Sequence, residues 1–500
     1  MRFRRCRHFY KLWMPAGPRI QTDLTQPGME TSKQTDSLLP VRLMQTAMIL
    51  LITGLLFGFV GSLQYVLPGW LKNQLSFERV RPMHVSSVLF WIILAAMGTT
   101  LYYAGERSGS SFKVRLAGKI MQALLLVSVA GILLSYLTGN FGGREYWEYP
   151  PLLSIPIALA WVLFVWIFIK HIRNLRQQPV YVWMWLTGAL FFLVTFSESY
   201  LYLIPYFRER VLLDMSIQWK SNGSIVGCWN LLIYGCSFYY MEKHDPSHTY
   251  SRSWLAFAMY FLGLFNLMFN WGHHIYTLPT HTYVRLISYA VSMTELIILA
   301  RIIHGWKKSM QSSKLFVSLP GYRFMLASEY WILLNLLLAI AMSVPAINIY
   351  THGTHITVAH AMGSTIGINS MLLLAFLHDI IWGKERKNRP WPVKSFWLLQ
   401  VSLLVFWLAL IAAGIRKGYW QFHEPQIPFQ KMMLGLRPYF IVFMLSGCTL
   451  IIGLMASVWP LLIRSVKRAR EIKNKSSLYV EHLPDEYHPI VPVRRDVAGK

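Results

Sequence analysis

The chain has 500 residues, of which 54% are hydrophobic, 15% aromatic and only 14% charged. A soluble globular domain carries roughly 25% charged residues, so this composition excludes an ordinary soluble protein. Repeated apolar stretches of about 20 residues instead predict a polytopic helical membrane protein. The formal net charge of +26 does not indicate nucleic-acid binding, because the basic residues cluster in loops on one predicted side of the membrane.

Neither the cysteines nor the N-terminal segment changes this interpretation. Cys6, Cys228, Cys236 and Cys448 show no paired or metal-type spacing, so neither a disulfide framework nor a thiolate metal site is expected. Residues 1–40 are basic and polar, without an apolar core or an adjacent cleavage site, and predict a cytoplasmic tail rather than a signal peptide.

Twelve apolar segments predict twelve transmembrane helices. They lie at about 43–66, 84–104, 118–138, 152–170, 182–205, 219–240, 254–276, 284–304, 326–348, 354–382, 395–415 and 434–464. We expect three regions: a basic tail at 1–40, a helical membrane domain at 41–465 and a second tail at 466–500. No soluble domain and no sequence repeat is expected.

The distribution of basic residues predicts the orientation. An even number of spans places both termini on one side, and the loops on that side are the basic ones. They carry Arg107, Lys113 and Arg115; Lys170, Arg173 and Arg176; Lys307 and Lys308; the run KERKNR; and the tail segment KRAREIKNK. The positive-inside rule therefore places both termini in the cytoplasm.

Two adjacent histidines, His273 and His274, end the seventh predicted span. Ionisable side chains are costly inside a membrane, and a metal is a common partner for histidine there. Successive helix positions are about 100° apart, so both side chains could reach one metal. The alternative is a pair of hydrogen-bonded polar residues at the membrane interface.

The predicted topology brings further histidines to the same depth. His84 begins the second span, and His360 lies near the start of the tenth; both spans run inward from the outside. With the pair at the outer end of the seventh span, three helices deliver histidines to the outer half of the membrane, as a shared cofactor layer requires. Met362 faces the opposite side of its helix from His360, and methionine is a known axial haem ligand. Alternatively, Met362 is core filler.

These residues stand within five motifs: VRPMH at 80–84, GREYWEYP at 143–150, GHHIY at 272–276, Glu295, and THGTHITVAHAMG at 351–363. Together they resemble the catalytic subunit of the cytochrome-c-dependent nitric oxide reductases in the haem-copper oxidase superfamily. The resemblance covers nearly all twelve spans. It implies an all-α fold, a twelve-helix bundle like subunit I of the haem-copper oxidases. The oxygen-reducing C-family oxidases are close relatives, from which Glu295 and the THGT segment distinguish the reductases.

The resemblance also implies roles for individual residues. His84 and Met362 would bind a low-spin haem b, and His360 would be the proximal ligand of a high-spin haem b. His273 and His274 would hold a non-haem iron or copper beside that haem. Two carboxylates complete the expected site, Glu295 next to this metal as the proton donor and Glu148 as a ligand of calcium that bridges the haem propionates.

The sequence departs from the reductase pattern in three ways. Met362 stands where the family has a histidine. Asn222 stands where the sixth span carries the third histidine of the non-haem metal, and asparagine is a weaker ligand than imidazole. The two glutamates of that span are replaced by Val226 and Asn230. Two histidines and Glu295, with Asn222, could still hold iron, or the site could be poor in metal.

Loss of those two carboxylates means that other groups must deliver protons. Glu198, in the fifth predicted span, is an intramembrane carboxylate with either a functional or a structural role.

The expected function is that of a membrane-bound respiratory oxidoreductase that reduces nitric oxide. Alternatives are nitric oxide dismutation, terminal oxidase chemistry, and a non-catalytic haem-binding subunit or nitric oxide sensor. A transporter would suit twelve spans but leaves the histidine layer unexplained. The expected partners are NO or O2, membrane lipid, and a periplasmic donor such as a cytochrome c or a haem-c subunit. The resemblance implies a location in the bacterial inner membrane.

Overall fold

The computed structural model describes residues 38–106, 112–172, 174–244, 250–275, 278–279, 281–312, 320–383 and 393–481. The side chains of some residues within these ranges, including His273, His274 and Glu295, lie outside the description. The described chain is helical throughout its regular structure, apart from an isolated β-bridge between Arg144 and Trp147.

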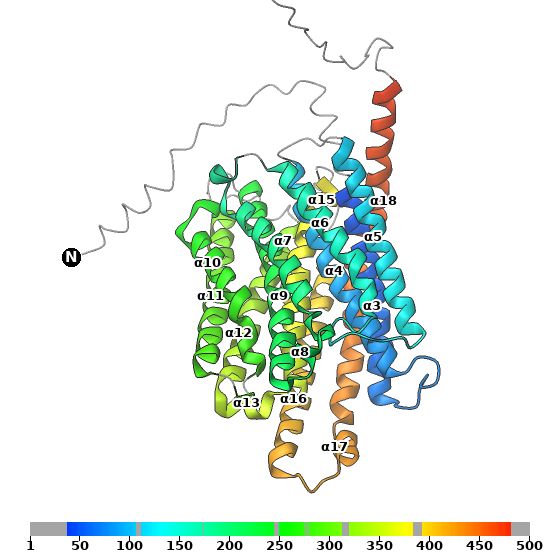
Figure 1. The fold of residues 1–500 in the computed structure, drawn as a ribbon, viewed down its shortest axis with the longest axis vertical. Helices are drawn as coiled ribbons and strands as arrows, with labels where there is room; N and C mark the ends of the chain where they lie inside the picture. Colours follow the sequence, from blue (N-terminus) through cyan, green and yellow to red (C-terminus); the bar gives the residue numbers. More distant parts are fainter. Residues whose placement is uncertain are drawn as a thin grey trace, which may run out of the picture.

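Long helices occupy the positions of all twelve predicted spans, which confirms the prediction of an all-α bundle (Figure 1). They are α3 (Leu38–Val66), α4 (Phe77–Gly105), α5 (Phe112–Leu137), α6 (Ser154–His171), α7 (Val180–Glu198), α9 (Val211–His244), α10 (Trp254–Phe269), α11 (Thr282–Ser312), α12 (Pro320–Ser343), α14 (His355–Met362) with α15 (Met371–Trp382), α16 (Val393–His423) and α18 (Arg437–Glu481). Short elements connect them: η1 (Pro151–Leu153), η2 (Leu175–Gln177), η3 (Leu201–Leu203), α8 (Pro205–Arg208), η4 (Tyr250–Arg252), η5 (Asn270–Ile275), α13 (Pro345–Thr351), η7 (Gly363–Ser370) and α17 (Phe429–Gly435).

The helices alternate in direction, and α3 begins at the same end of the bundle at which α18 ends (Figure 1). Following the predicted topology, we name this the inner end and the opposite one the outer end. The last helix continues to Glu481 and extends beyond the other helices at the inner end, so the first part of the predicted C-terminal tail is helical. The N-terminal tail up to residue 37 and the segment after 481 lie outside the described residues.

Nine helices in the described part of the chain are long and apolar enough to cross a membrane. The predicted sixth, seventh and eighth spans, α9, α10 and α11, are not among these nine, and α10 has 16 residues. These three helices pack consecutively against one another. Asn222 lies in α9, the histidine pair in η5 directly after α10, and Glu295 in α11.

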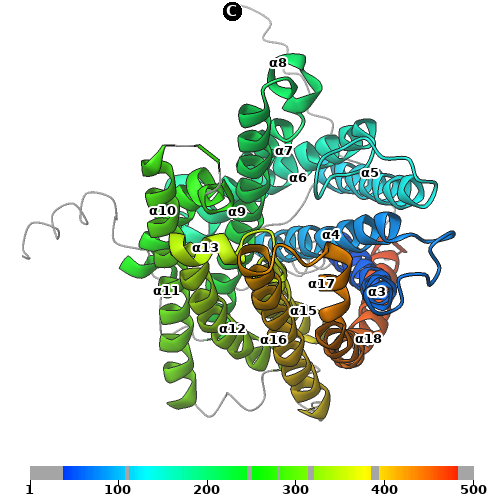
Figure 2. The same cartoon turned by 90° about the horizontal axis from the view of Figure 1, so that it is seen from below.

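Helix α4 lies in the middle of the bundle and contacts α3, α5, α9 and α15 (Figure 2). Its side chains are buried almost without interruption from Leu89 to Leu101. Polar groups on it find partners on other helices, as they must where no water is present. The indole nitrogen of Trp91, for example, donates to the hydroxyl of Ser370 at 3.0 Å.

The tenth span is interrupted by η7, an eight-residue π-helix between α14 and α15. Segments of π-helix are rare and occur most often at functional sites. Side chains stabilise this one: Asn335 donates to Ser364 at 2.8 Å, and Ser370 donates to the carbonyl of Thr365 at 2.7 Å. The π-helix therefore separates the candidate ligand helix α14 from the inner end of the same span.

Candidate haem and metal site

His84 lies two turns inside α4 and is fixed against α3. Its Nδ1 lies 2.7 Å from the carbonyl oxygen of Gly54, which can only accept, so Nδ1 carries the proton. A Cβ atom at Gly58 would approach the same nitrogen to 2.8 Å, so glycine is required there for the ring to fit. The other nitrogen, Nε2, is left as the metal-binding position, the usual arrangement of a histidine ligand held by a second hydrogen bond.

The candidate haem ligands are only partly covered by the helices around them. The side chains of His84 and His360 both keep accessible surface. Met362, on the same helix as His360, is also partly accessible and packs against the main core. These residues fit a bound haem, which needs an imidazole or a thioether that is not already covered by protein.

Asn222, the expected substitute for the third metal histidine, lies on α9 beside the segment that carries the histidine pair. A Cβ atom at its neighbour Gly223 would lie 3.1–3.3 Å from Trp271 in η5, so α9 and η5 are in backbone contact. The amide nitrogen of Asn222 points to the backbone carbonyl of Glu145 at 3.4 Å. A contact of this length is a weak hydrogen bond that can be redirected at small cost.

Asn230 stands on α9 at one of the two positions where the reductases have a glutamate, and it forms a hydrogen bond with another helix. The amide of Asn369, in the π-helix, donates to Oδ1 of Asn230 at 3.1 Å. The adjacent Ser370 accepts from Trp91. A neutral pair therefore joins α9 to η7 at this position, and the second replaced position, Val226, is apolar.

Glu198, the intramembrane carboxylate of the fifth span, forms an ion pair with Lys220 of α9. Its other oxygen, Oε2, is buried and has no hydrogen-bond partner. Since a buried carboxylate needs a compensating cation, Lys220 gives this residue a structural role at the outer ends of α7 and α9.

The outer loop between α5 and α6 is tied to α4 by one arginine. Arg81 donates to Glu148 at 2.8 Å and to Glu145 at 3.2 Å. The backbone nitrogens of Gly142 and Gly143 donate to the carbonyl of Glu148 at 3.0 and 3.2 Å, which closes the loop. Oε2 of Glu148 remains buried without a hydrogen-bond partner, and one carboxylate oxygen is thus available to a hard cation such as calcium.

No group of three or more histidine, cysteine or acidic side chains in the described part of the chain is arranged to hold a metal ion. A calcium ion at Glu148 would therefore need oxygen ligands beyond these side chains. Burial raises the pKa of the neighbouring Glu145 even though Arg81 acts in the opposite direction. Burial also raises the pKa of Tyr146 to about 12, and this residue adopts a left-handed backbone with φ of 73°.

For His273, His274 and Glu295 the structure describes the backbone only. His273 and His274 lie in η5, directly after the outer end of α10, and Glu295 lies in α11. Their side chains lie outside the described residues. The structure brings η5 against α9 and α11, the two helices that carry Asn222 and Glu295.

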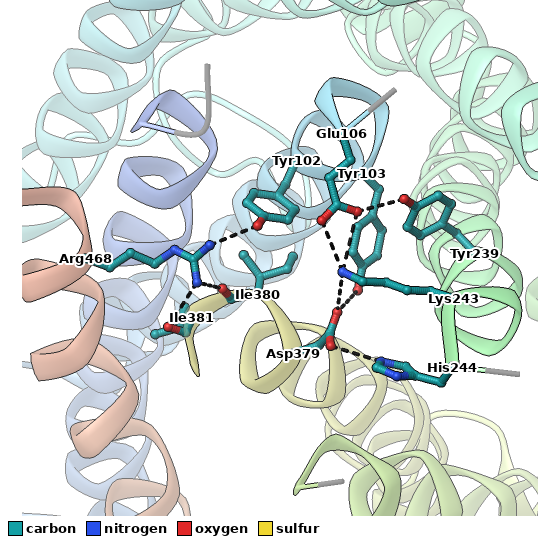
Figure 3. Close-up of polar contacts among 10 residues, drawn as sticks. All are labelled: Tyr102, Tyr103, Glu106, Tyr239, Lys243, His244, Asp379, Ile380, Ile381 and Arg468. Atoms are coloured by element: carbon teal, nitrogen blue, oxygen red, sulfur yellow. Dashed lines mark hydrogen bonds and ion pairs between the residues drawn. The ribbon is translucent and has the colours of Figure 1, made fainter. Parts of the chain in front are cut away.

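Sequence reasoning missed a group of ionisable residues at the inner end, which we name the inner cluster: Tyr102, Tyr103, Glu106, Tyr239, Lys243, His244, Asp379 and Arg468 (Figure 3). Asp379, at the end of α15, accepts from Lys243 at 3.0 Å and lies 2.9 Å from Nε2 of His244. Glu106 accepts from the same lysine at 3.1 Å and from Tyr239 at 2.7 Å. The sequence signal was a charged residue at the end of each apolar span, which ordinarily indicates only the membrane boundary.

The family model for cytochrome c and quinol oxidase polypeptide I matches residues 40–449. The chain belongs to this family. It is a membrane respiratory oxidoreductase of the haem-copper oxidase subunit I type, a family that binds haems and a copper or non-haem iron. This agrees with the partly accessible side chains of His84 and His360.

Individual relatives of this chain are distant, and they include both oxidases and a nitric oxide reductase. The chain is 24% identical over 465 residues to cytochrome c oxidase subunit 1 of Rhodobacter capsulatus, covering 84% of each chain. It is 22% identical over 405 residues to a nitric oxide reductase subunit of Stutzerimonas stutzeri, covering 74% of this chain and 82% of that one. A solved structure of a heme-copper terminal oxidase dimer superposes with a TM-score of 0.63 at 15% identity, covering 86% of this chain and 84% of that one. These relatives support the fold and the class of chemistry in general.

Proposed function

We propose that this chain is the catalytic subunit of a nitric oxide reductase-like enzyme of the bacterial inner membrane, with both termini in the cytoplasm. The reaction is the reduction of two NO molecules by two electrons and two protons to N2O and water. The electrons come from a periplasmic donor such as a cytochrome c or a haem-c subunit. Support for NO over O2 comes from Glu295 and the THGT segment, which the reductases share.

The observation that carries this proposal is the fixed ring of His84. Its Nδ1 is committed to Gly54 at 2.7 Å, which leaves Nε2 for a metal, and the side chain keeps accessible surface. A buried imidazole in water-free surroundings is costly unless both nitrogens are used, and a haem iron uses the second one. The resemblance pairs His84 with Met362 of α14, and the two would hold the low-spin haem b.

The remaining residues have roles at the reaction centre. His360 would hold the high-spin haem, while His273 and His274, with Glu295 and Asn222, would hold a non-haem iron or copper. When bound, these groups supply one-electron transfer and a centre for NO. Glu295 would donate a proton near this centre, and the carboxylate of Glu148 would help to bind calcium at the outer edge.

The test is haem and metal analysis of the purified protein together with an NO consumption assay. We expect two haems b per chain, a low-spin spectrum with methionine ligation, a high-spin signal, and N2O formed with an electron donor. A protein without a high-spin haem would refute the proposal. Oxygen formed from NO without a donor would instead support dismutation, and turnover of O2 but not NO would support a terminal oxidase.

A second candidate is a haem-binding subunit or nitric oxide sensor without catalysis. Two observations favour it: the amide of Asn222 is directed to the outer loop, and Asn230 is used to hold the π-helix. Both positions of the reductase site then have structural roles. Steady NO turnover that is lost in His273→Ala would exclude this candidate.

A further inference from the structure

The inner part of α11 exposes a polar stripe on the outside of the bundle. This helix lies at the edge of the bundle and packs against α10 and α12 (Figure 2). Arg301, His304 and Lys308 follow one another at spacings of three and four residues, so they share one face of α11. All three are exposed, and the side chain of His304 is 68% exposed. Charged residues in membrane helices ordinarily face the interior of the bundle, so this outward stripe calls for a partner outside it.

Helix α12 forms the other half of the same surface. Nδ1 of His304 lies 3.1 Å from Oε1 of Glu329, and the ammonium group of Lys307 lies 5.5 Å from the ring centre of Tyr330. The tyrosine is itself 57% exposed. These contacts join the inner parts of the two helices into one surface. We name it the basic face; it consists of Arg301, His304, Lys307, Lys308, Glu329 and Tyr330.

Positive charge is in excess on the basic face. One arginine and two lysines stand against a single carboxylate, that of Glu329, whose side chain is only 7% exposed. Glu329 is the only acidic residue of α12. The only one of α11, Glu295, lies about 9 Å from Arg301 along the axis toward the outer end. The exposed cations are therefore suited to bind an anion that comes from outside the chain.

The basic face is open at its centre and continues as an apolar surface toward the outer end. A Cβ atom at Gly305, between Arg301 and Lys308, would have no neighbour within 4 Å. One turn and more toward the outer end, the exposed side chains on the same faces of the two helices are apolar: Ile297 of α11 and Leu333 and Leu337 of α12. Anion-binding groups at the membrane surface above an apolar strip match the two parts of a phospholipid.

We propose that the basic face binds one anionic phospholipid of the inner leaflet, with the phosphate held by Arg301 and Lys308 and the acyl chains along the apolar strip. Basic pockets between transmembrane helices on the cytoplasmic side bind anionic headgroups. The guanidinium of Arg301 suits this role because its planar fork can donate two parallel hydrogen bonds to a phosphate. His304 and Glu329 position the site by holding α11 against α12. The lipid site does not depend on the reaction that the protein catalyses.

The position of the charges favours a lipid over a transmembrane helix of another protein. From Arg301 to Lys308 the charges extend over about 10 Å along the axis, at the inner end of α11. This is the depth of a headgroup. A partner helix would run along the whole length of α11, but the exposed side chains at Ile297 and Leu286 are apolar and give it no polar complement.

Native mass spectrometry of the full-length protein in detergent, titrated with dioleoyl phosphatidylglycerol or with neutral dioleoyl phosphatidylcholine, tests this proposal. We expect the wild type to bind one phosphatidylglycerol about tenfold more tightly than phosphatidylcholine. Arg301→Gln and Lys308→Gln should each weaken that binding about fivefold, and the double variant about twentyfold, because each basic group near the membrane surface contributes a similar amount. Arg301→Lys, which keeps the charge but loses the fork, should bind more tightly than Arg301→Gln.

The matched control is Lys119→Gln, which removes an exposed lysine near the inner end of α5. It should leave the affinity unchanged, and an equal loss there would overturn the proposal by showing a response to general surface charge. Unchanged affinity in the double variant would overturn it as well. Displacement of the lipid by an equal concentration of inorganic phosphate would show a site for free anions instead. A co-purifying protein that excludes the lipid would show that the face binds a partner helix.

Discussion

The two ends of α9 differ in the contacts that their side chains make and in how far those contacts can be predicted from the sequence. At the outer end, Asn222 makes one weak contact of 3.4 Å where a metal ligand is expected. At the inner end, Lys243 and His244 take part in a dense network with Asp379 and Glu106. A single substitution at Asn222 can therefore restore a metal ligand at the outer end. In the inner cluster the charged groups share partners, so removing one of them leaves others without an ion pair.

The largest effect expected at the outer end is loss of a haem from His84→Ala. The side chain removed is the only histidine of α4, and its ring is positioned by Gly54 and Gly58. We expect the haem content to fall from two per chain to one, with loss of the low-spin absorption. A variant that keeps two haems would show that His84 is not a haem ligand.

The inner end is tested by Lys243→Met. The variant leaves the buried Asp379 and the half-buried Glu106 without their shared cation, and breaking such a buried pair costs about 3 kcal/mol. The outer pair offers the control, because Lys220→Met removes a lysine that is 39% exposed. Because Glu198 is 18% exposed and Asp379 only 5%, loss of the outer pair should cost less than loss of the inner one.

Thermal unfolding of both variants, followed by tryptophan fluorescence, measures this difference. The midpoint should fall clearly further in Lys243→Met than in Lys220→Met. Equal losses would show that the inner network is no stronger than the outer pair.

A smaller effect is expected from restoring a histidine at the outer end with Asn222→His. Imidazole is a better ligand than a neutral amide for iron and copper, so affinity for the second metal should rise about tenfold or more. Metal titration of the purified variant measures it, with the wild-type protein as the reference. No gain in affinity would indicate that η5 and α9 do not present their ligands to one metal.

The same comparison explains which features the sequence revealed. The helices and the outer-layer residues follow from apolar length and from motifs whose spacing is local, such as the residues around His84 and His360. The inner cluster could not be predicted, because Glu106, Lys243 and Asp379 lie 136 or more residues apart and only packing brings them together. The π-helix could not be predicted either, because its polar residues form hydrogen bonds with α4, α9 and α12, which are distant in the sequence.

The smallest expected effect is a pH dependence of the outer loop, carried by Glu145. Burial raises the pKa of this carboxyl in the folded loop above its value in an open one, so the folded loop binds more protons in weakly acidic solution. Loop stability should therefore decrease as the pH rises from the open-loop pKa, about 4.3, to the higher folded value, and remain level above it. Glu145→Gln should abolish that decrease.

Fluorescence of Trp147, which lies buried in the same loop, reports this opening when its change on pH titration is compared between wild type and variant. The effect should be small, because the Glu145 side chain is 36% exposed and Arg81 partly offsets the burial. A wild-type loop that becomes more stable as the pH rises would show that Arg81 dominates, and that the outer loop is held by its ion pairs as the inner cluster is. Ion pairs would then stabilise both ends of the bundle, and the inner cluster would differ from the outer loop only in having more charged groups.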